Sequence, residues 1–270
     1  MIYLEILTIF IFGLCFGSFI TMASYRFGLE NISVKDFIFR NSFCPKCNKQ
    51  LKFWHLFPLF SWLFYKGKCA MCRSKISIRY PLIEIITSAV FVSAFLALGQ
   101  INLELILILL MVVLLLIMII VDLENYFIPN QTLVALAILI FIYHLLIPSG
   151  HNLGHYILSA IGFFLFGIII HFGFLFFTKK HGIGEDDLKF FAIAGLMLGI
   201  DRLMIYMILN GVFGAIFGII WMKLKKDETF PFAPAITIAF FICVIFDIDY
   251  IEWFGYLLYL LQKHILGTAY

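Results

Sequence analysis

Long apolar runs constrain this chain more than any other feature of its sequence. The run from Leu105 to Val121 contains no charged residue. A helix that crosses a bilayer needs about 20 predominantly apolar residues. Segments of this kind cover residues 2–25, 81–99, 102–123, 130–148, 154–178, 187–200, 201–222 and 231–248. We therefore expect an all-α polytopic membrane protein with about eight transmembrane helices, and leave open whether residues 250–266 also cross the membrane.

The composition excludes most soluble alternatives. The 270 residues are 63% hydrophobic and 13% charged, whereas ordinary soluble domains are about 45–50% apolar and about 25% charged. A globule of this size cannot bury so much apolar surface, because much of any fold faces its solvent. The solvent is therefore mostly lipid, which argues against a soluble enzyme, a disordered chain or a nucleic-acid-binding protein.

Three pairs of glycines have the GxxxG spacing that lets membrane helices approach closely. The abundance of glycine in membrane helices accounts for them equally well. The pairs are Gly13 and Gly17, Gly195 and Gly199, and Gly214 and Gly218.

The basic residues predict the orientation. Of the 19 Lys and Arg residues, 11 lie between the first two apolar segments, and Lys179, Lys180 and Lys223 lie in later loops. Cytoplasmic loops of membrane proteins are enriched in Lys and Arg. We therefore predict that the first loop is cytoplasmic and that the N-terminus is outside. Counting spans forward from there places the three later lysines in the cytoplasm as well.

Four cysteines in the first loop predict a metal site. Cys44 and Cys47 form one C-x-x-C pair, and Cys69 and Cys72 form a second after 21 intervening residues. This is a zinc-ribbon pattern, although the interval slightly exceeds the usual spacing of about 15–20 residues. Disulfides are disfavoured in a reducing cytoplasm. Four sulfur ligands leave no open position, so the predicted zinc is structural.

Acidic residues at the edges of apolar segments are candidate functional residues, because carboxylates in a membrane are costly. Asp122 ends the longest apolar run and precedes Pro129, and residues 182–187 read Gly-Ile-Gly-Glu-Asp-Asp. The predicted topology places both at the cytoplasmic boundary. Two close carboxylates share a proton, so that one acts as general base on water and the other polarises the scissile carbonyl. Glu84 either pairs with Arg79 or serves a site.

Two other classes of protein are consistent with some of these features. Membrane carboxylates also serve ion-coupled transporters, although transporter sites usually lie near the midplane rather than at one face. A zinc-dependent membrane protease is disfavoured because the sequence contains no H-E-x-x-H motif.

In these motifs the chain resembles the type IV prepilin peptidase and N-methyltransferase family, from about residue 13 to 236. Six motifs match in order, and together they are far more specific than any one alone. They are Gly17-Ser18-Phe19 with Tyr25-Arg26, the two C-x-x-C pairs, residues 79–84 (RYPLIE), Asp122 with Ile128-Pro129-Asn130, residues 182–189 (GIGEDDLK), and residues 230–234 (FPFAP).

The resemblance implies that Asp122 and Asp187 are the catalytic residues. Two positions depart from the family pattern, since Asp186 replaces the glycine before the catalytic aspartate of the GxGD motif and Ala233 replaces a glycine. The offset to Lys189 favours Asp187 as the catalytic residue. The alternative is that Asp186 takes over this role, or that the changed motif marks an inactive assembly factor.

The resemblance also implies the substrates and the compartment. The substrates would be prepilins and pseudopilins with a basic leader, processed at the cytoplasmic face of a bacterial inner membrane, and Glu124, Glu185 and Asp186 would attract that leader. The enzyme would also methylate the new N-terminus with S-adenosylmethionine, whose binding residues the sequence does not reveal, unless it is a peptidase-only member. We expect the zinc loop to support methylation and leader handling rather than proteolysis. The oligomeric state stays open.

These inferences divide the chain into four functional segments. They are a first transmembrane helix (1–25), a cytoplasmic four-cysteine zinc-binding loop (26–80), a transmembrane aspartic protease core (81–248) and a C-terminal apolar segment (249–270).

Overall fold

The computed structural model describes residues 2–29, 37, 41–148, 150–179, 184–225 and 230–246. Within these residues the chain is helical, with two isolated β-bridges and no longer strand. It forms two compact units, residues 1–132 and 133–270, which are described separately. The ambiguous segment 250–266 lies outside the described residues.

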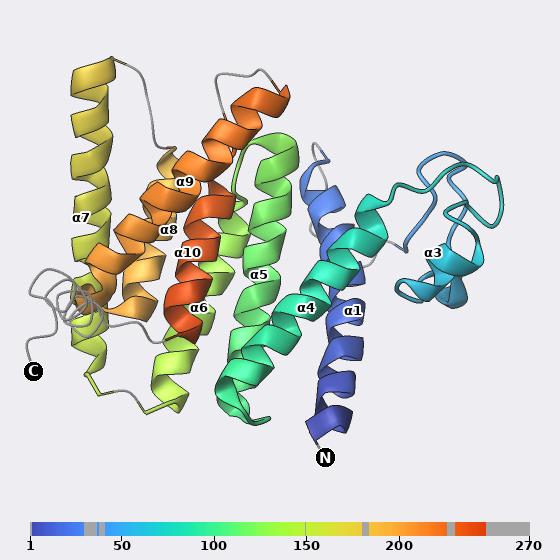
Figure 1. The fold of residues 1–270 in the computed structure, drawn as a ribbon, viewed down its shortest axis with the longest axis horizontal. Coiled ribbons are helices and arrows are strands. Elements are labelled where there is room, and N and C mark those ends of the chain that lie inside the picture. Colours follow the sequence, from blue (N-terminus) through green and yellow to red (C-terminus); the bar gives the residue numbers. More distant parts are fainter. Residues whose placement is uncertain are drawn as a thin grey trace, which may run out of the picture. The chain divides into compact units, whose positions relative to one another are not determined.

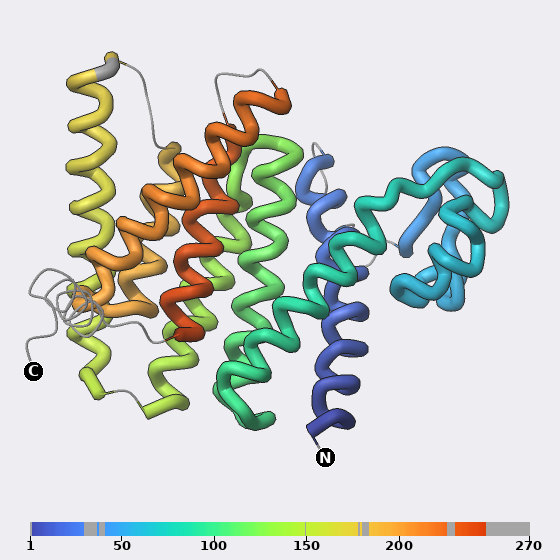
Figure 2. The backbone as a smooth tube through the Cα atoms, viewed as in Figure 1, coloured from blue at the N-terminus to red at the C-terminus, as the bar shows by residue number. Residues whose placement is uncertain are grey.

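Three long helices build the first unit: α1 (Ile2–Phe27), α4 (Arg79–Leu98) and α5 (Leu103–Asn125). Helices α1 and α4 cross closely (Figures 1 and 2). A Cβ atom added to Gly13 would lie 2.5 Å from the Cα of Ser88, and one added to Gly17 would lie 2.5 Å from the Cα of Glu84. The first GxxxG pair is therefore a contact surface between helices.

The segment between α1 and α4 folds as a small irregular domain. It contains the 3-10 helix η1 (Phe53–His55) and the short helix α3 (Phe60–Phe64). The indole nitrogen of Trp62 donates to the carbonyl oxygen of Ile76 at 3.3 Å. Gly67 has a φ of +65°, and an added Cβ would lie 2.9 Å from the Trp62 ring. The turn that leads into the second cysteine pair therefore requires glycine.

The second unit is a bundle of helices. Its elements are α6 (Asn130–Leu146), which begins just before the division, α7 (Leu153–Thr178), α8 (Glu185–Leu198), the 3-10 helix η2 (Ile200–Arg202), α9 (Leu203–Lys225) and α10 (Ala233–Ile245).

Helix α7 packs along α8, and α9 packs along α10. The other two glycine pairs contribute in different ways. A Cβ on Gly195 would lie 2.7 Å from the carbonyl oxygen of Ser159, so this glycine lets α8 approach α7. Gly199 has a φ of +78° and ends α8. A Cβ on Gly214 would lie 2.9 Å from the ring of Phe232. Glycines of all three pairs therefore meet packing or backbone demands, beyond simple abundance.

The chain is a multi-pass membrane protein. Five helices are long and apolar enough to cross a bilayer: α1, α4, α5, α7 and the continuous segment Ile200–Lys225. Each of the eight predicted segments coincides with a described helix. However, α6, α8 and α10 have only 17, 14 and 13 residues. The count of eight spans therefore stays a prediction.

Exposed apolar side chains agree with a lipid environment. Phe176 and Phe177 near the end of α7 are 80% and 84% exposed.

The apolar context of Cys15 and Cys243 predicts buried positions for both. Cys243 is fully buried, whereas Cys15 is exposed on α1, so the expectation for Cys15 was wrong.

Candidate metal centre and active site

The four loop cysteines come together. Their sulfur atoms all lie within 4.8 Å of one another, and the Sγ atoms of Cys44 and Cys72 are 3.9 Å apart. Cys44 and Cys69 are buried, while Cys47 and Cys72 are more accessible. This arrangement is compatible with a tetrahedral zinc site and provides the donor set that structural zinc prefers.

Both C-x-x-C pairs are built on the same backbone turn. The amide of Cys44 donates to the carbonyl of Lys49 at 3.0 Å, and the amide of Cys69 donates to the carbonyl of Ser74 at 2.8 Å. Four residues after each first cysteine, Asn48 and Arg73 have φ values of 53° and 59°. Each turn is closed by one of the two β-bridges. The two halves of the cluster are therefore equivalent knuckles.

Electrostatics favour thiolate at one of these ligands. The hydroxyl of Ser74 lies 3.1 Å from the Sγ atom of Cys72. This hydrogen bond lowers the pKa of Cys72 to about 6. A cysteine must lose its proton to bind a metal, so this hydrogen bond favours the metal-binding form of Cys72.

Asp122 lies in the last turn of α5 and is 6% exposed. Its backbone carbonyl accepts a hydrogen bond from the amide of Tyr126 at 2.9 Å, and Tyr126 ends the helix with a φ of 60°. Proline cannot continue a helix, and the helix is interrupted before Pro129, since α5 ends at Asn125 and α6 begins at Asn130. The chain thus places this aspartate at a helix end, within the first unit.

Asp187 lies in the first turn of α8, in the second unit, and is 9% exposed. Its Oδ2 atom accepts a hydrogen bond from the amide of Gly184 at 3.0 Å. The neighbouring Asp186 is more exposed and forms an ion pair with Lys189, whose Nζ lies 2.7 Å from Oδ1. The two adjacent acids therefore differ: Asp187 is buried and held by the backbone, and Asp186 is a surface ion-pair partner.

Glu84 does not pair with Arg79. Instead, Arg79 binds the carboxylate of Glu124 through two nitrogens and donates to the hydroxyl of Ser24 at 2.8 Å. The Oε2 atom of Glu84 accepts a hydrogen bond from the amide of Leu59 at 2.7 Å. Of the two interpretations of Glu84, the ion pair with Arg79 was wrong.

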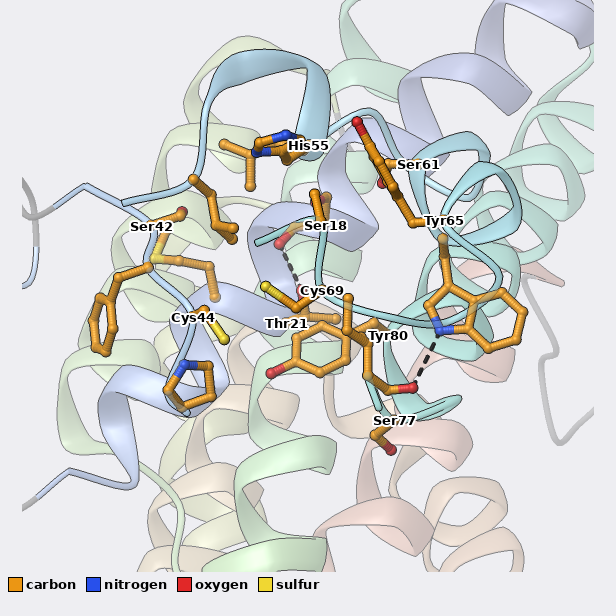
Figure 3. A pocket seen from close by; sticks show the side chains of 18 of the residues that line it. Ser18, Thr21, Ser42, Cys44, His55, Ser61, Tyr65, Cys69, Ser77 and Tyr80 are labelled. Carbon is orange, nitrogen blue, oxygen red and sulfur yellow. Dashed lines mark hydrogen bonds between the residues drawn. The ribbon is translucent and has the colours of Figure 1, made fainter. Parts of the chain in front are cut away.

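A cavity of about 380 Å³ lies between α1, the cysteine loop and α4 (Figure 3). Its walls combine hydroxyl groups and aromatic rings with Glu84 and two of the cysteines. Sequence reasoning missed this cavity. The only signal was Glu84 itself, an acid in an apolar segment with no assigned role.

Two family models match consecutive parts of the chain. Residues 11–98 match the Bacterial Peptidase A24 N-terminal domain, and residues 108–219 match the Type IV leader peptidase family. A relative from Bacillus subtilis named prepilin leader peptidase/N-methyltransferase is 32% identical over 84% of this chain and 89% of its own length. The chain belongs to the type IV leader peptidase family.

Other members have the same name. The relative from Aeromonas salmonicida is 28% identical over 91% of this chain and 92% of its own length. The relative from Neisseria gonorrhoeae is 28% identical over 85% of this chain and 86% of its own. No solved structure matches the chain significantly. The N-terminal model covers the four cysteines and Glu84, and the peptidase model covers Asp122 and Asp187.

Proposed function

We propose that this chain removes the leader peptide of prepilins with the carboxyl groups of Asp122 and Asp187. Membership of the type IV leader peptidase family, together with the shared name of its relatives, carries the activity: the chain is a membrane peptidase with N-methyltransferase activity. The same findings set aside the ion-coupled transporter. The proposal adds the residues that perform the cleavage.

Burial of both aspartates supports this assignment. Each side chain is at least nine-tenths buried within its own unit, although each belongs to a strongly apolar protein in which such burial is costly. In the proposed mechanism one carboxylate takes a proton from the attacking water. The other, protonated, donates to the carbonyl oxygen of the scissile bond and later helps to protonate the departing amine.

Asp187 is the better candidate than Asp186. A general base must be held in a fixed orientation toward its substrate, and the amide of Gly184 holds the buried carboxylate of Asp187 through Oδ2. Asp186 is occupied by Lys189 and partly exposed. The altered GxGD motif therefore leaves the catalytic position intact in this proposal, and Asp186 tunes the local charge.

The wider arrangement belongs to the same proposal. We infer eight transmembrane helices, an outside N-terminus, an inner-membrane location and cleavage at the cytoplasmic face. The four-cysteine cluster would hold structural zinc and support methylation rather than cleavage. The substrates would include pseudopilins as well as prepilins.

The decisive experiment compares Asp122→Asn, Asp187→Asn and Asp186→Asn in membranes with a prepilin substrate. A general base contributes about 10²–10⁴-fold to a rate, so the first two variants should lose at least about 100-fold in cleavage. Asp186→Asn is the matched control, because it makes the same chemical change one residue away, and it should retain most of the rate. Normal processing by Asp122→Asn or Asp187→Asn would refute the assigned pair.

A further inference from the structure

The cavity in the first unit plays no part in the proposed cleavage, yet it has the properties of a ligand site. Its volume of about 380 Å³ falls within the range of about 300–1,000 Å³ typical of small-molecule sites. All of its lining residues belong to the first unit. Figure 3 shows side chains from α1, from the cysteine loop and from the start of α4 around it.

A buried carboxylate forms part of the wall. Glu84 is 6% exposed and accepts a hydrogen bond from the amide of Leu59, an uncharged donor. Among the described residues no basic side chain pairs with Glu84, because Arg79 is bound to Glu124. A buried charge without a counter-charge is costly. The cavity therefore favours a ligand that brings a positive charge to Glu84.

The other side chains of the lining further restrict the chemical class of the ligand. The rings of Trp62, Tyr65 and Tyr80 line the cavity, and aromatic faces attract organic cations. Four basic side chains also line it and offer partners to a carboxylate: Arg26, Lys46, Lys68 and Lys75. The lining thus suits a small zwitterionic molecule with an additional cationic centre, and the lysines disfavour the basic leader of a prepilin as the occupant.

We propose that this cavity is the methyl-transfer site, and that Glu84 is its catalytic residue. S-adenosylmethionine has the required chemistry: an aromatic base, a sulfonium cation and an amino-acid end. The inference rests on the methyltransferase activity in the proposed function, and adds the place and the residue.

The reaction at this site balances as a simple substitution. The N-terminal amine of the cleaved pilin attacks the methyl carbon, and a nitrogen–carbon bond forms as the sulfur–carbon bond breaks. Sulfur keeps the electron pair and becomes a neutral thioether. The nitrogen loses one proton, which the Glu84 carboxylate accepts. An N-terminal amine has a pKa of about 7.7–8.0, so a neighbouring base is useful at neutral pH.

Binding to the purified full-length chain in detergent tests this directly. The probes are S-adenosylmethionine, the cationic analogue sinefungin and the neutral product S-adenosylhomocysteine. Glu84→Gln should weaken binding of the two cationic probes at least about tenfold and change binding of the neutral product much less. Glu104→Gln, another carboxylate at a helix end of the same unit, is the matched control and should bind all three as the parent does.

A second pair of variants tests the cavity without touching Glu84. Ser61→Phe places bulk in the lining drawn in Figure 3, and Ser93→Phe places the same bulk on the exposed surface of α4. Only Ser61→Phe should abolish binding, and both should still cleave prepilin, which also shows that they fold. Equal affinities of Glu84→Gln and the parent for S-adenosylmethionine would overturn the proposal, as would equal binding by the two phenylalanine variants.

The mass of the pilin product distinguishes failure of the assigned methyltransferase activity from failure of the assignment of its site to this cavity. If the parent enzyme added no methyl group to the pilin, the assigned methyltransferase activity would fail. If the parent methylated and Glu84→Gln methylated at the same rate, only the assignment of this cavity would fail. Preferential binding of a leader peptide to the cavity would also overturn it.

A different cluster, in the second unit, carries a second inference. His151 precedes α7, His155 lies in its first turn, and Asp201 lies in η2. The Nε2 atoms of the two histidines lie 3.9 and 3.6 Å from the same Oδ2 atom of Asp201. The Nε2 atom of His155 is buried and makes no hydrogen bond within the described residues. We infer a two-histidine, one-carboxylate site for a transition-metal dication such as Cu²⁺ or Zn²⁺.

Cu²⁺ is the probe because its electron paramagnetic resonance spectrum shows whether nitrogen atoms bind it. After the cysteines are saturated with zinc, one further Cu²⁺ per chain should remain bound through desalting and show nitrogen hyperfine coupling in its electron paramagnetic resonance spectrum. His155→Gln should remove this signal, and His171→Gln, farther along α7, should leave it unchanged. Absence of bound copper, or an unchanged spectrum in His155→Gln, would refute the site.

Discussion

The crossing of α1 and α4 gives the sharpest test of the fold, through the substitution Gly17→Ala. The added Cβ atom would lie 2.5 Å from the Cα of Glu84. Ordinary contact begins at 3.4 Å, so the helices must separate by about 3.4 − 2.5 = 0.9 Å at this point. The obstacle is backbone and cannot rotate away. Overpacking of this kind costs about 1–3 kcal/mol.

The matched control is Gly211→Ala, since a Cβ atom there meets nothing within 4 Å on α9. An alanine inside a helix is intrinsically better than glycine by about 0.8–1.0 kcal/mol, so this variant should be as stable as the parent or slightly more stable. Unfolding in detergent, followed by circular dichroism against denaturant, measures both. Equal stability of the two variants would refute close packing at Gly17. Because Glu84 moves with the backbone, Gly17→Ala should also impair methylation more than cleavage.

Three further predictions address other parts of the molecule. Cys44→Ser should lower bound zinc, measured by mass spectrometry of the metal, and should impair methylation while leaving much more cleavage than Asp122→Asn does; equal loss of cleavage would contradict a supporting role. Glu185→Gln should raise the KM for a prepilin with a basic leader at low salt and lose this effect at high salt, because Glu124 and Asp186 are already ion-paired and screening weakens exposed charges; a salt-independent KM would exclude steering. Lys179→Gly should stabilise the chain by about 1 kcal/mol, since Lys179 ends α7 with a φ of 54° and left-handed backbone costs a non-glycine residue about 1–2 kcal/mol; unchanged unfolding would show that the strain is relieved elsewhere.

The helices were predictable because the apolar runs and their breaks are local features. The stop before Pro129 follows from backbone chemistry alone. The start of α8 is marked by the acidic residues of its first turn, which the helix dipole favours. The four cysteines were predictable for the same reason, since their spacing encodes two knuckle turns. The contrast between Asp186 and Asp187 was only partly predictable: the offset to Lys189 favoured Asp187 as the catalytic residue, but it did not indicate that Lys189 pairs with Asp186.

Long-range contacts were not predictable. The bond from Leu59 to Glu84 joins residues 25 apart, and the Arg79–Glu124 pair joins residues 45 apart. Both depend on how α1, α4 and α5 cross, and no local pattern encodes that. The error at Cys15 has a related cause. Lipid-facing and core-facing residues of a membrane helix are equally apolar, so hydropathy cannot tell which side of α1 is buried.

The Arg79 contacts have a mechanical consequence. Arg79 is the first residue of α4. Its guanidinium binds the carboxylate of Glu124 at the end of α5 and donates a hydrogen bond to Ser24 near the end of α1. These contacts join the ends of α1, α4 and α5 at one level, and Asp122 lies only two residues before Glu124. We therefore expect a change in bilayer thickness to displace the opposite ends of these three helices more than the end of α5 that carries Asp122.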